Sequence, residues 1–298
     1  MKTPIITNSS LGTFLALPIA LFACASASAQ LSVESFNGYT VGSPVTSTTP
    51  SPTVAGYTGN WTGIDFGTQW PTVSAGSLNY TGAGYDNSTG NHIGVPNNTT
   101  GGEIVAANSS RMYRLLDSSL AVSGSTSGTL YLSWLFQSGQ ETGATTYQML
   151  DLYNGNTANA SRTFTAGLTS NGGLTGNQYD FGVNEAYSST GINANTGVHL
   201  FVVKFNLSAV AAADSVTLWL DPTLGGAGDP TGGTTVSGQN IAFDRLAISD
   251  YDGNSANWSD IRWGATINSV TAVPEPSTFA LASLGGLALL FRRKQNRA

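Results

Sequence analysis

Carboxylates are the first residues to consider, because a polysaccharide-cleaving enzyme needs two of them flanking the scissile bond, about 5–9.5 Å apart. The chain has four glutamates before its C-terminal segment, and each stands alone: Glu34, Glu103, Glu141 and Glu185. The nearest pair is Asp180 and Glu185, but residues five apart on a strand point to opposite faces unless a bulge intervenes. The sequence therefore predicts no catalytic pair, and we expect a protein that is not an enzyme.

Other nucleophilic or metal-binding chemistry has few residues to draw on. His92 and His199 are the only histidines, and the only cysteine is Cys24. Zinc sites need several His and Cys ligands, and the nucleophile elbow of a serine hydrolase needs Gly-x-Ser-x-Gly, which this sequence lacks. His199 lies within an apolar stretch, so we expect it to be structural.

The strongest candidate for a ligand site is Asp250-Tyr251-Asp252-Gly253-Asn254. Oxygen donors at Asp250, Asp252 and Asn254 around a glycine turn could begin a calcium loop, although the glycine and the twelfth position do not fit an EF-hand. The alternative is an acidic turn before the last strand, which Asp-Gly-Asn forms readily. No cofactor other than calcium is predicted.

Aromatic residues could form a platform for sugars. Trp61, Trp70 and Tyr85 lie in stretches rich in Gly and Thr, and exposed rings of this kind stack on glycans. The alternative for Trp61 and Trp70 is packing in the core. Trp134, Trp219 and Trp263 lie in apolar stretches, so we expect them in the core.

The charge of the chain limits the classes of partner that it can bind. Only 9% of its 298 residues are charged, and its formal net charge is −6. Residues 30–273 contain six basic and sixteen acidic residues, a net charge of −10, because four of the eleven basic residues crowd the C-terminus. An acidic domain without a basic stripe repels phosphate backbones, so we expect no nucleic-acid partner. Cations and neutral polysaccharide are compatible with this charge.

Residues 1–29 have the three parts of a secretory signal peptide. Lys2 supplies the positive charge, residues 11–25 are apolar, and Ala27-Ser28-Ala29 is a small-x-small cleavage site. A run of about 15 apolar residues is short for a membrane span. A lipoprotein signal at Leu21-Phe22-Ala23-Cys24 is the alternative, but the bulky Phe22 fits it poorly. We therefore predict cleavage after Ala29 and export across the inner membrane.

Residues 272–298 also have three parts: Pro274-Glu275-Pro276, an apolar run over 278–291, and a basic cluster that includes Arg292 and Arg293. Two prolines around one residue form a stiff, extended segment. The apolar run of 14 residues spans about 21 Å as a helix, short for a bilayer core of about 30 Å. The positive-inside rule places the preceding domain outside the membrane. An ordinary tail anchor is the alternative.

Together these three parts resemble the PEP-CTERM sorting signal. The resemblance implies processing by an exosortase, in bacteria that make exopolysaccharide. It also implies transient membrane anchoring through a short C-terminal transmembrane helix, followed by location at the cell surface or in the extracellular matrix. It indicates a destination and not an activity.

Residues 30–271 show the apolar periodicity of strands, and Gly/Asn/Ser/Thr clusters separate them. The only helix-like piece, 208–214, is short. Many short strands without alternating helices predict an all-β, two-sheet antiparallel β-sandwich in one domain, with the signal peptide before it and the hydrophobic helix after it. The clearest strand candidates are 129–136, 198–207, 215–220, 241–248 and 260–267.

The order of several short motifs resembles laminin-G or concanavalin-like jelly rolls. These motifs are Glu34 to Tyr39, Gly59-Asn60-Trp61, Leu218-Trp219-Leu220-Asp221-Pro222 and Ser259-Asp260-Ile261-Arg262, the last without the glutamate of the family pattern. The resemblance implies a jelly roll that binds glycans or cleaves them, and the hydrolases of this fold carry Glu-x-Asp-x-x-Glu on one strand. That run does not occur in this sequence.

We therefore expect a non-enzymatic surface or matrix protein associated with exopolysaccharide that binds carbohydrate. One alternative is a polysaccharide-degrading enzyme, a glycoside hydrolase or lyase, with an unfamiliar site. The other is a purely structural surface protein without a ligand.

Overall fold

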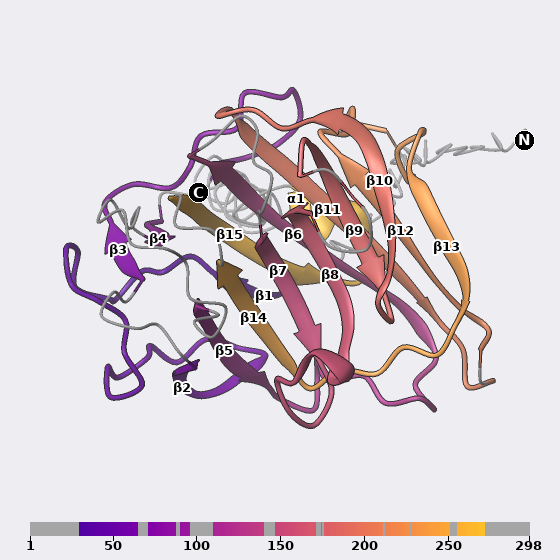
Figure 1. The fold of residues 1–298 in the computed structure, drawn as a ribbon, viewed down its shortest axis with the longest axis horizontal. Coiled ribbons are helices and arrows are strands. Elements are labelled where there is room, and N and C mark those ends of the chain that lie inside the picture. Colours follow the sequence, from indigo (N-terminus) through magenta and orange to yellow (C-terminus); the bar gives the residue numbers. More distant parts are fainter. Residues whose placement is uncertain are drawn as a thin grey trace, which may run out of the picture.

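The computed structural model describes residues 30–64, 71–87, 90–95, 110–139, 147–170, 174, 176–210, 212–226, 228–250 and 255–271. Within these residues the chain forms fifteen strands and two short helices (Figure 1). The helices are η1 (Asn159–Ser161) and α1 (Ile267–Thr271). The strands form two sheets, named sheet A and sheet B below, and every paired strand is antiparallel to its partner.

Sheet A has eight strands in the order β13-β12-β11-β6-β15-β4-β3, and β1 also pairs with β15. Its strands are β1 (Gln30–Glu34), β3 (Thr72–Ser74), β4 (His92–Val95), β6 (Gly128–Ser138), β11 (Val198–Leu207), β12 (Asp214–Leu220), β13 (Thr234–Gln239) and β15 (Ala256–Gly264).

Sheet B has seven strands in the order β10-β9-β8-β7-β14-β5-β2. Its strands are β2 (Tyr57–Ile64), β5 (Ser110–Leu116), β7 (Tyr147–Tyr153), β8 (Arg162–Thr169), β9 (Gln178–Val183), β10 (Ala186–Asn193) and β14 (Arg245–Asp250). The chain crosses between the sheets at β5-β6-β7 and again at β13-β14-β15, which gives the jelly-roll topology. The predicted all-β, two-sheet sandwich is confirmed.

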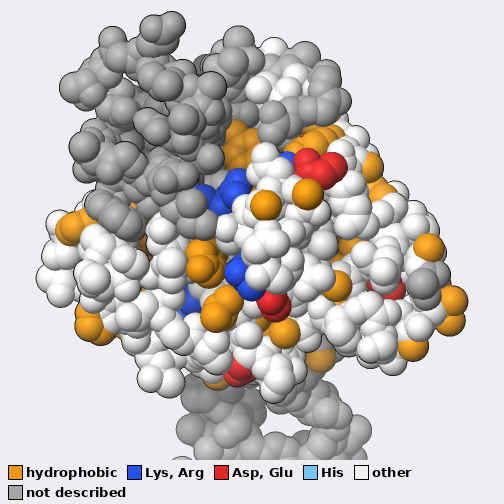
Figure 2. All heavy atoms as spheres, turned by 60° about the horizontal axis from the view of Figure 1, so that its bottom comes forward, with side chains coloured by type: hydrophobic (Ala, Val, Ile, Leu, Met, Phe, Trp, Pro, Cys, Tyr) orange, Lys and Arg blue, Asp and Glu red, His pale blue; other side chains and the backbone are white. Residues whose placement is uncertain are grey.

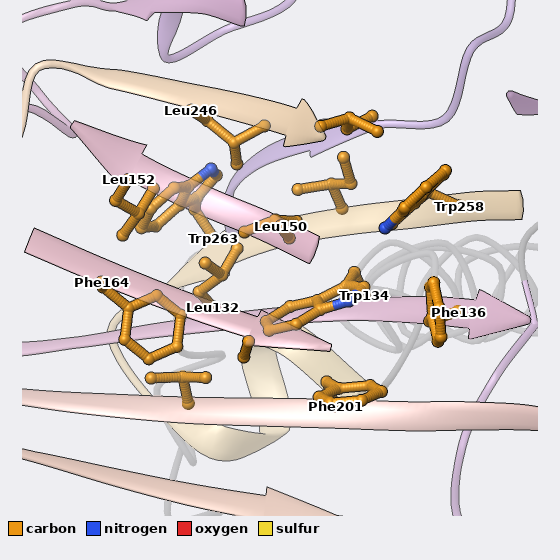
Figure 3. Close-up of a cluster of buried hydrophobic side chains, with 14 of the residues drawn as sticks. Leu132, Trp134, Phe136, Leu150, Leu152, Phe164, Phe201, Leu246, Trp258 and Trp263 are labelled. Carbon is orange, nitrogen blue, oxygen red and sulfur yellow. The ribbon is translucent and has the colours of Figure 1, made fainter. Parts of the chain in front are cut away.

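The main core lies between the sheets because alternate residues of each strand face inward. Phe201, Val203 and Phe205 of β11 are completely buried on one side, as the alternation in this stretch predicts. Figure 3 shows Leu150 and Leu152 of sheet B facing the aromatic residues of sheet A. Trp134 and Trp263 belong to this core, as expected, and Trp134 stacks on Phe201 with ring centroids 4.9 Å apart.

The outer face of sheet A carries a second apolar cluster, which α1 covers. The helix contributes Ile267 and Val270, which pack with buried residues that include Leu135 and Leu200. The Ser133 hydroxyl donates to the Val270 carbonyl at 2.5 Å. The outer face of sheet A is therefore apolar and covered, by α1 together with Leu78, Tyr80 and Tyr85.

The predicted helix-like piece at 208–214 is wrong. Its described residues form the turn between β11 and β12, with Ala212 in the left-handed region at φ 59°. The Asp214 carboxylate accepts from the Ser208 and Ile241 backbone N–H groups at 2.7 and 2.6 Å, so a side-chain acceptor closes the turn.

A buried ion pair joins the two sheets at one edge. Glu34 ends β1 in sheet A, Arg114 lies on β5 in sheet B, and Arg114 Nη1 is 2.6 Å from Glu34 Oε2. The side chains are 1% and 2% exposed. Arg114 also donates to the carbonyls of Gly59 and Pro52 at 3.1 and 2.7 Å, and Glu34 accepts from the Phe36 N–H. Both charges are thus compensated inside the protein.

We expect Arg114→Ala to lower the free energy of unfolding by about 3–5 kcal/mol, because it leaves the buried Glu34 carboxylate without its positively charged partner. Urea denaturation measures the loss. The control is Arg245→Ala, whose ion pair with Asp244 is partly exposed and worth about 1 kcal/mol or less. Equal losses in the two variants would contradict the role assigned to Arg114.

Candidate functional site

Trp61 and Tyr85, two of the three residues proposed as a sugar platform, lie in different buried clusters. Trp61 is 1% exposed and stacks on Phe36 with ring centroids 6.2 Å apart, so the core alternative holds for it. Tyr85 is 9% exposed, and its ring lies 4.7 Å from the Arg262 guanidinium, so the expectation of an exposed Tyr85 ring is wrong. The Trp61 ring fills apolar space between the sheets, and the Tyr85 ring fills apolar space on the outer side of sheet A. Trp70 lies outside the described residues.

The predicted calcium loop falls largely outside the described residues. Asp250 is the buried last residue of β14, in register with Gln148 of β7 and Ser110 of β5. Asp252 and Asn254 are among the residues that the structure does not describe. Among the described residues, no group of three or more His, Cys, Asp or Glu side chains could hold a metal ion. Calcium binding at this loop remains a prediction.

The two ends of the chain, 1–29 and 272–298, also lie outside the described residues, including Pro274, Glu275, Pro276, Arg292 and Arg293. In the part of the chain that the structure describes, no helix is both long and apolar enough to cross a membrane. The last described residue, Thr271, is buried, and its carbonyl accepts from the Asp86 N–H at 3.1 Å. The fold therefore extends up to the first residue of the C-terminal segment.

His199 has a partner at each ring nitrogen. Nδ1 is 2.5 Å from Asp221 Oδ2, and Nε2 is 3.0 Å from Asn195 Oδ1. The Tyr179 ring lies 4.6 Å from the imidazole. These contacts are those expected of a structural histidine.

The outer face of sheet B is polar, in contrast to that of sheet A. On β7, Leu150 and Leu152 enter the core, so Met149, Asp151 and Tyr153 lie on the outer side. The neighbouring strands continue the pattern with outward-facing polar residues that include Arg111, Thr165, Asp180 and Ser249. These four polar side chains are all buried, so they must find partners within the protein.

Asp151 is the centre of this polar layer. It is completely buried and accepts four hydroxyl hydrogen bonds. Thr165 and Tyr147 donate to Oδ1 at 2.5 and 3.0 Å, and Ser249 and Tyr153 donate to Oδ2 at 2.5 and 3.1 Å. Burial raises the pKa of Asp151, and the charge of Arg111 and the hydroxyl donors act in the opposite direction. We call Asp151 and its four hydroxyl donors, Tyr147, Tyr153, Thr165 and Ser249, the Asp151 cluster.

Arg111 extends the cluster toward β5. Its Nε donates to Ser249 Oγ at 3.0 Å, and Nη1 donates to the Thr157 carbonyl at 2.5 Å. The guanidinium lies 4.8 Å from the Tyr153 ring. Arg111 thus ties the β7–β8 loop to the outer face of the sheet.

Arg162 extends the cluster toward the other edge of the sheet. It forms a two-pronged ion pair with Glu185, with Nε···Oε1 and Nη2···Oε2 both 2.7 Å. Nη1 donates to the Tyr147 hydroxyl, and Nη2 donates to the Tyr187 hydroxyl at 2.6 Å. A continuous series of hydrogen bonds therefore connects Glu185 to Asp151.

The structure corrects the predicted geometry of Asp180 and Glu185. They were expected on opposite faces of one strand, but β9 ends at Val183 and a tight turn follows. Asn184 and Glu185 have φ values of 49° and 63°, in the left-handed region. The turn carries Glu185 back to Arg162 on the outer face, the same side as Asp180. Asn184 is the sequence signal for such a turn, because Asn tolerates this conformation.

Tyrosine–arginine contacts recur across this face. The ring centroids lie 4.8–5.9 Å from the guanidinium carbons, which is the range of cation–π contacts. Tyr113 and Tyr187, near the two sides of the sheet, remain partly exposed. Figure 2 shows basic, acidic and hydrophobic side chains close together on the face that comes forward when the bottom of Figure 1 is turned toward the viewer. The pairs are Tyr113–Arg245, Tyr153–Arg111, Tyr147–Arg162 and Tyr187–Arg162.

This arrangement offers aromatic rings between fixed donors and acceptors, which is the chemistry that holds a hydroxylated ligand. The sequence analysis did not identify Asp151, Arg162 or Tyr187. The usable signal was Tyr147-Gln148-Met149-Leu150-Asp151-Leu152-Tyr153, where polar or aromatic residues alternate with leucines as in a strand with one core face.

We expect Asp151→Ala to lower the free energy of unfolding by about 2–4 kcal/mol, because four buried hydroxyl donors lose their acceptor. Differential scanning calorimetry measures the change. Asp117→Ala is the control, because Asp117 is only partly buried and its carboxylate accepts from the Ser119 N–H and hydroxyl at a surface turn. A loss no larger than that of the control would show that Asp151 does not organise the layer.

Three solved structures are similar to this chain at low sequence identity and low TM-score. The globular domain of T. cruzi calreticulin is 13% identical, with a TM-score of 0.43, covering 79% of this chain and 95% of that chain. An endo-1,3-β-glucanase from Streptomyces sioyaensis is 11% identical, with a TM-score of 0.44, covering 80% and 96%. A carbohydrate esterase from the Shiga toxin-encoding bacteriophage phi24B is 10% identical, with a TM-score of 0.39, covering 65% and 88%.

A comparison with the curated proteins gives no match to this chain. A comparison with protein-family models gives one, and it covers the C-terminal segment that the sequence analysis singled out. Residues 272–294 match the PEP-CTERM protein-sorting motif, which implies export, membrane anchoring at the C-terminus and processing by an exosortase. The chain is thus an all-β sandwich followed by a PEP-CTERM sorting motif.

Proposed function

We propose that the processed protein is a non-enzymatic protein of the cell surface or extracellular matrix that binds neutral polysaccharide. The binding residues are the two partly exposed tyrosines at the margins of the buried outer layer of sheet B, Tyr113 on β5 and Tyr187 on β10. The PEP-CTERM motif supports the exported location, and the chemistry of this face supports the ligand class.

The observation that carries the proposal is the pair of partly exposed tyrosines held by arginines on the same face. Arg245 lies 5.5 Å from the Tyr113 ring, and Arg162 lies 5.9 Å from the Tyr187 ring. A tyrosine ring offers an apolar face and a hydroxyl to a sugar, and fixing the ring in advance lowers the entropy lost on binding.

The charge of the face supports a neutral ligand. Arg162 is paired with Glu185 and Arg245 with Asp244, both at 2.7 Å, so neither presents an uncompensated positive charge. The domain as a whole carries a net charge of −10 over residues 30–273 and repels anionic polymers.

The proposal that the face is not catalytic rests on how its acids are held. Asp151 already accepts four hydrogen bonds, and Glu185 faces Arg162 on both of its oxygens. A glycosidase needs one carboxyl group that donates a proton to the leaving group and a second that acts as base or nucleophile. Neither Asp151 nor Glu185 has the open position for these roles, and the third acid of this face, Asp180, is only 1% exposed.

We expect Tyr113→Ala and Tyr187→Ala each to weaken binding to a neutral polysaccharide about 5-fold to 100-fold, because each removes a stacking ring worth about 1–3 kcal/mol. The measurement is isothermal calorimetry or affinity electrophoresis against the polysaccharide of the producing cells. Val210→Ala, in an exposed turn beside sheet A, is the matched control and should bind like the wild type.

The same samples distinguish the other two functions. Release of reducing ends from the polysaccharide would indicate a polysaccharide-degrading enzyme in place of a binding protein. Absence of both binding and release would leave a purely structural surface protein. The proposal requires binding without release, lost in the two tyrosine variants and retained in the control.

We expect a chain with Pro274, Glu275 and Pro276 replaced by alanine to keep its C-terminal segment in cells that contain an exosortase. The wild-type chain should lose most of residues 272–298, because the processing enzyme acts at this motif. Intact-mass spectrometry of surface protein measures both outcomes. Equal C-termini in the two proteins would contradict processing through this motif.

A further inference from the structure

The hairpin of β9 and β10, at the edge of sheet B, carries an oxygen-rich group of side chains. Asp180 is in register with Ser189, and Gln178 is in register with Asn193. The ladder is irregular between Ser189 and Asn193, where Gly191 has φ 75°. Such irregular edges re-aim side chains and often lie beside functional sites.

Asp180 is 1% exposed, and neither of its carboxylate oxygens has a hydrogen-bond partner among the described residues. Gly167, across the ladder on β8, contributes no side-chain donor. The nearest arginine along this face, Arg162, is bound to Glu185. The Asp180 carboxylate therefore has no positively charged partner among the described side chains.

The Ser189 hydroxyl beside Asp180 cannot compensate the negative charge of the Asp180 carboxylate. Gln178 Nε2 donates to Asn193 Oδ1 at 3.2 Å, which turns Gln178 Oε1 toward Ser189. The Ser189 hydroxyl donates its only proton to that Oε1 at 2.8 Å, and its oxygen accepts from the Gly191 N–H at 3.1 Å. Ser189 thus presents lone pairs, as does the carboxylate.

Acceptor oxygens of a buried Asp180 and of the half-buried Gln178 and Ser189 therefore lie on the same side of the hairpin without a positive charge. A buried ionised carboxylate is stable only when it is paired or binds a cation. Burial raises the pKa of Asp180 to about 7, which Ser189 lowers only in part, so at neutral pH the missing charge is a proton or a metal ion.

We propose that a calcium ion binds between β9 and β10, held by the Asp180 carboxylate, Ser189 Oγ and Gln178 Oε1. Calcium takes six to eight oxygen ligands in flexible geometry, so neutral side-chain oxygens and water complete its shell, whereas magnesium demands a regular octahedron. A single carboxylate places the dissociation constant at about 10⁻⁴–10⁻³ M, the range of extracellular modules. The ion joins the edge strand β10 to the sheet next to Tyr187. The site does not depend on polysaccharide binding.

The test uses the full chain after chelation, at pH 7.5 and without polysaccharide. Calcium should raise the Tm of the wild type, with saturation at about 0.1–1 mM, because it binds only the folded state. Asp180→Asn should remove this response. The variant should fold, because it replaces an uncompensated charge with a neutral side chain of the same shape. Asp117→Asn, at an exposed turn, should respond like the wild type.

Two outcomes would overturn the proposal. A calcium response that persists in Asp180→Asn would place the ion elsewhere, for example at residues 250–254. No response, together with an Asp180 carboxyl carbon signal that titrates near pH 7 by NMR, would show that a proton supplies the charge. In that case the folded state binds the proton more tightly than the unfolded state does. The wild type would then lose stability relative to Asp180→Asn as pH rises from about 4 to about 7.

Discussion

The outer face of sheet B depends on one buried carboxylate. Asp151 receives hydroxyls from its own strand, from Thr165 on β8 and from Ser249 on β14. Arg111 and Arg162 attach to this group from the two sides and position the residues beyond it. Buried polar groups of this kind are stable only when each has a partner, so the layer forms as a unit. The partly exposed Tyr187 is tied to this layer through Arg162, whereas Tyr113 is held by Arg245.

The two sheets differ in what covers them, and this decides where a ligand can bind. Sheet A is covered by α1 and an apolar cluster, and the sorting motif begins directly after the last residue of α1. The chain therefore leaves the sandwich on the side of sheet A.

The strands were most predictable from the sequence where one face of the strand is apolar and buried in the core. Residues 198–207 form β11 with the predicted face toward the core, because the alternation of apolar residues in this stretch fits only a strand. The predicted strand at 241–248 is shifted to Arg245–Asp250, since Ile241 and Phe243 fill the core from a loop. The last strand begins earlier than predicted, at Ala256, because its polar-looking start pairs with both β4 and β6. The Asp151 cluster brings together residues from three strands, and no local pattern specifies such a meeting.

The most direct test of the account is to map the bound polysaccharide on the protein by NMR. Fragments of the neutral polysaccharide are titrated into the labelled domain, and shifts of backbone amides and tyrosine rings are followed. The account predicts saturable shifts on β5, β8 and β10 around Tyr113 and Tyr187, with sheet A unchanged. Saturable shifts confined to sheet A and its covering helix would contradict it.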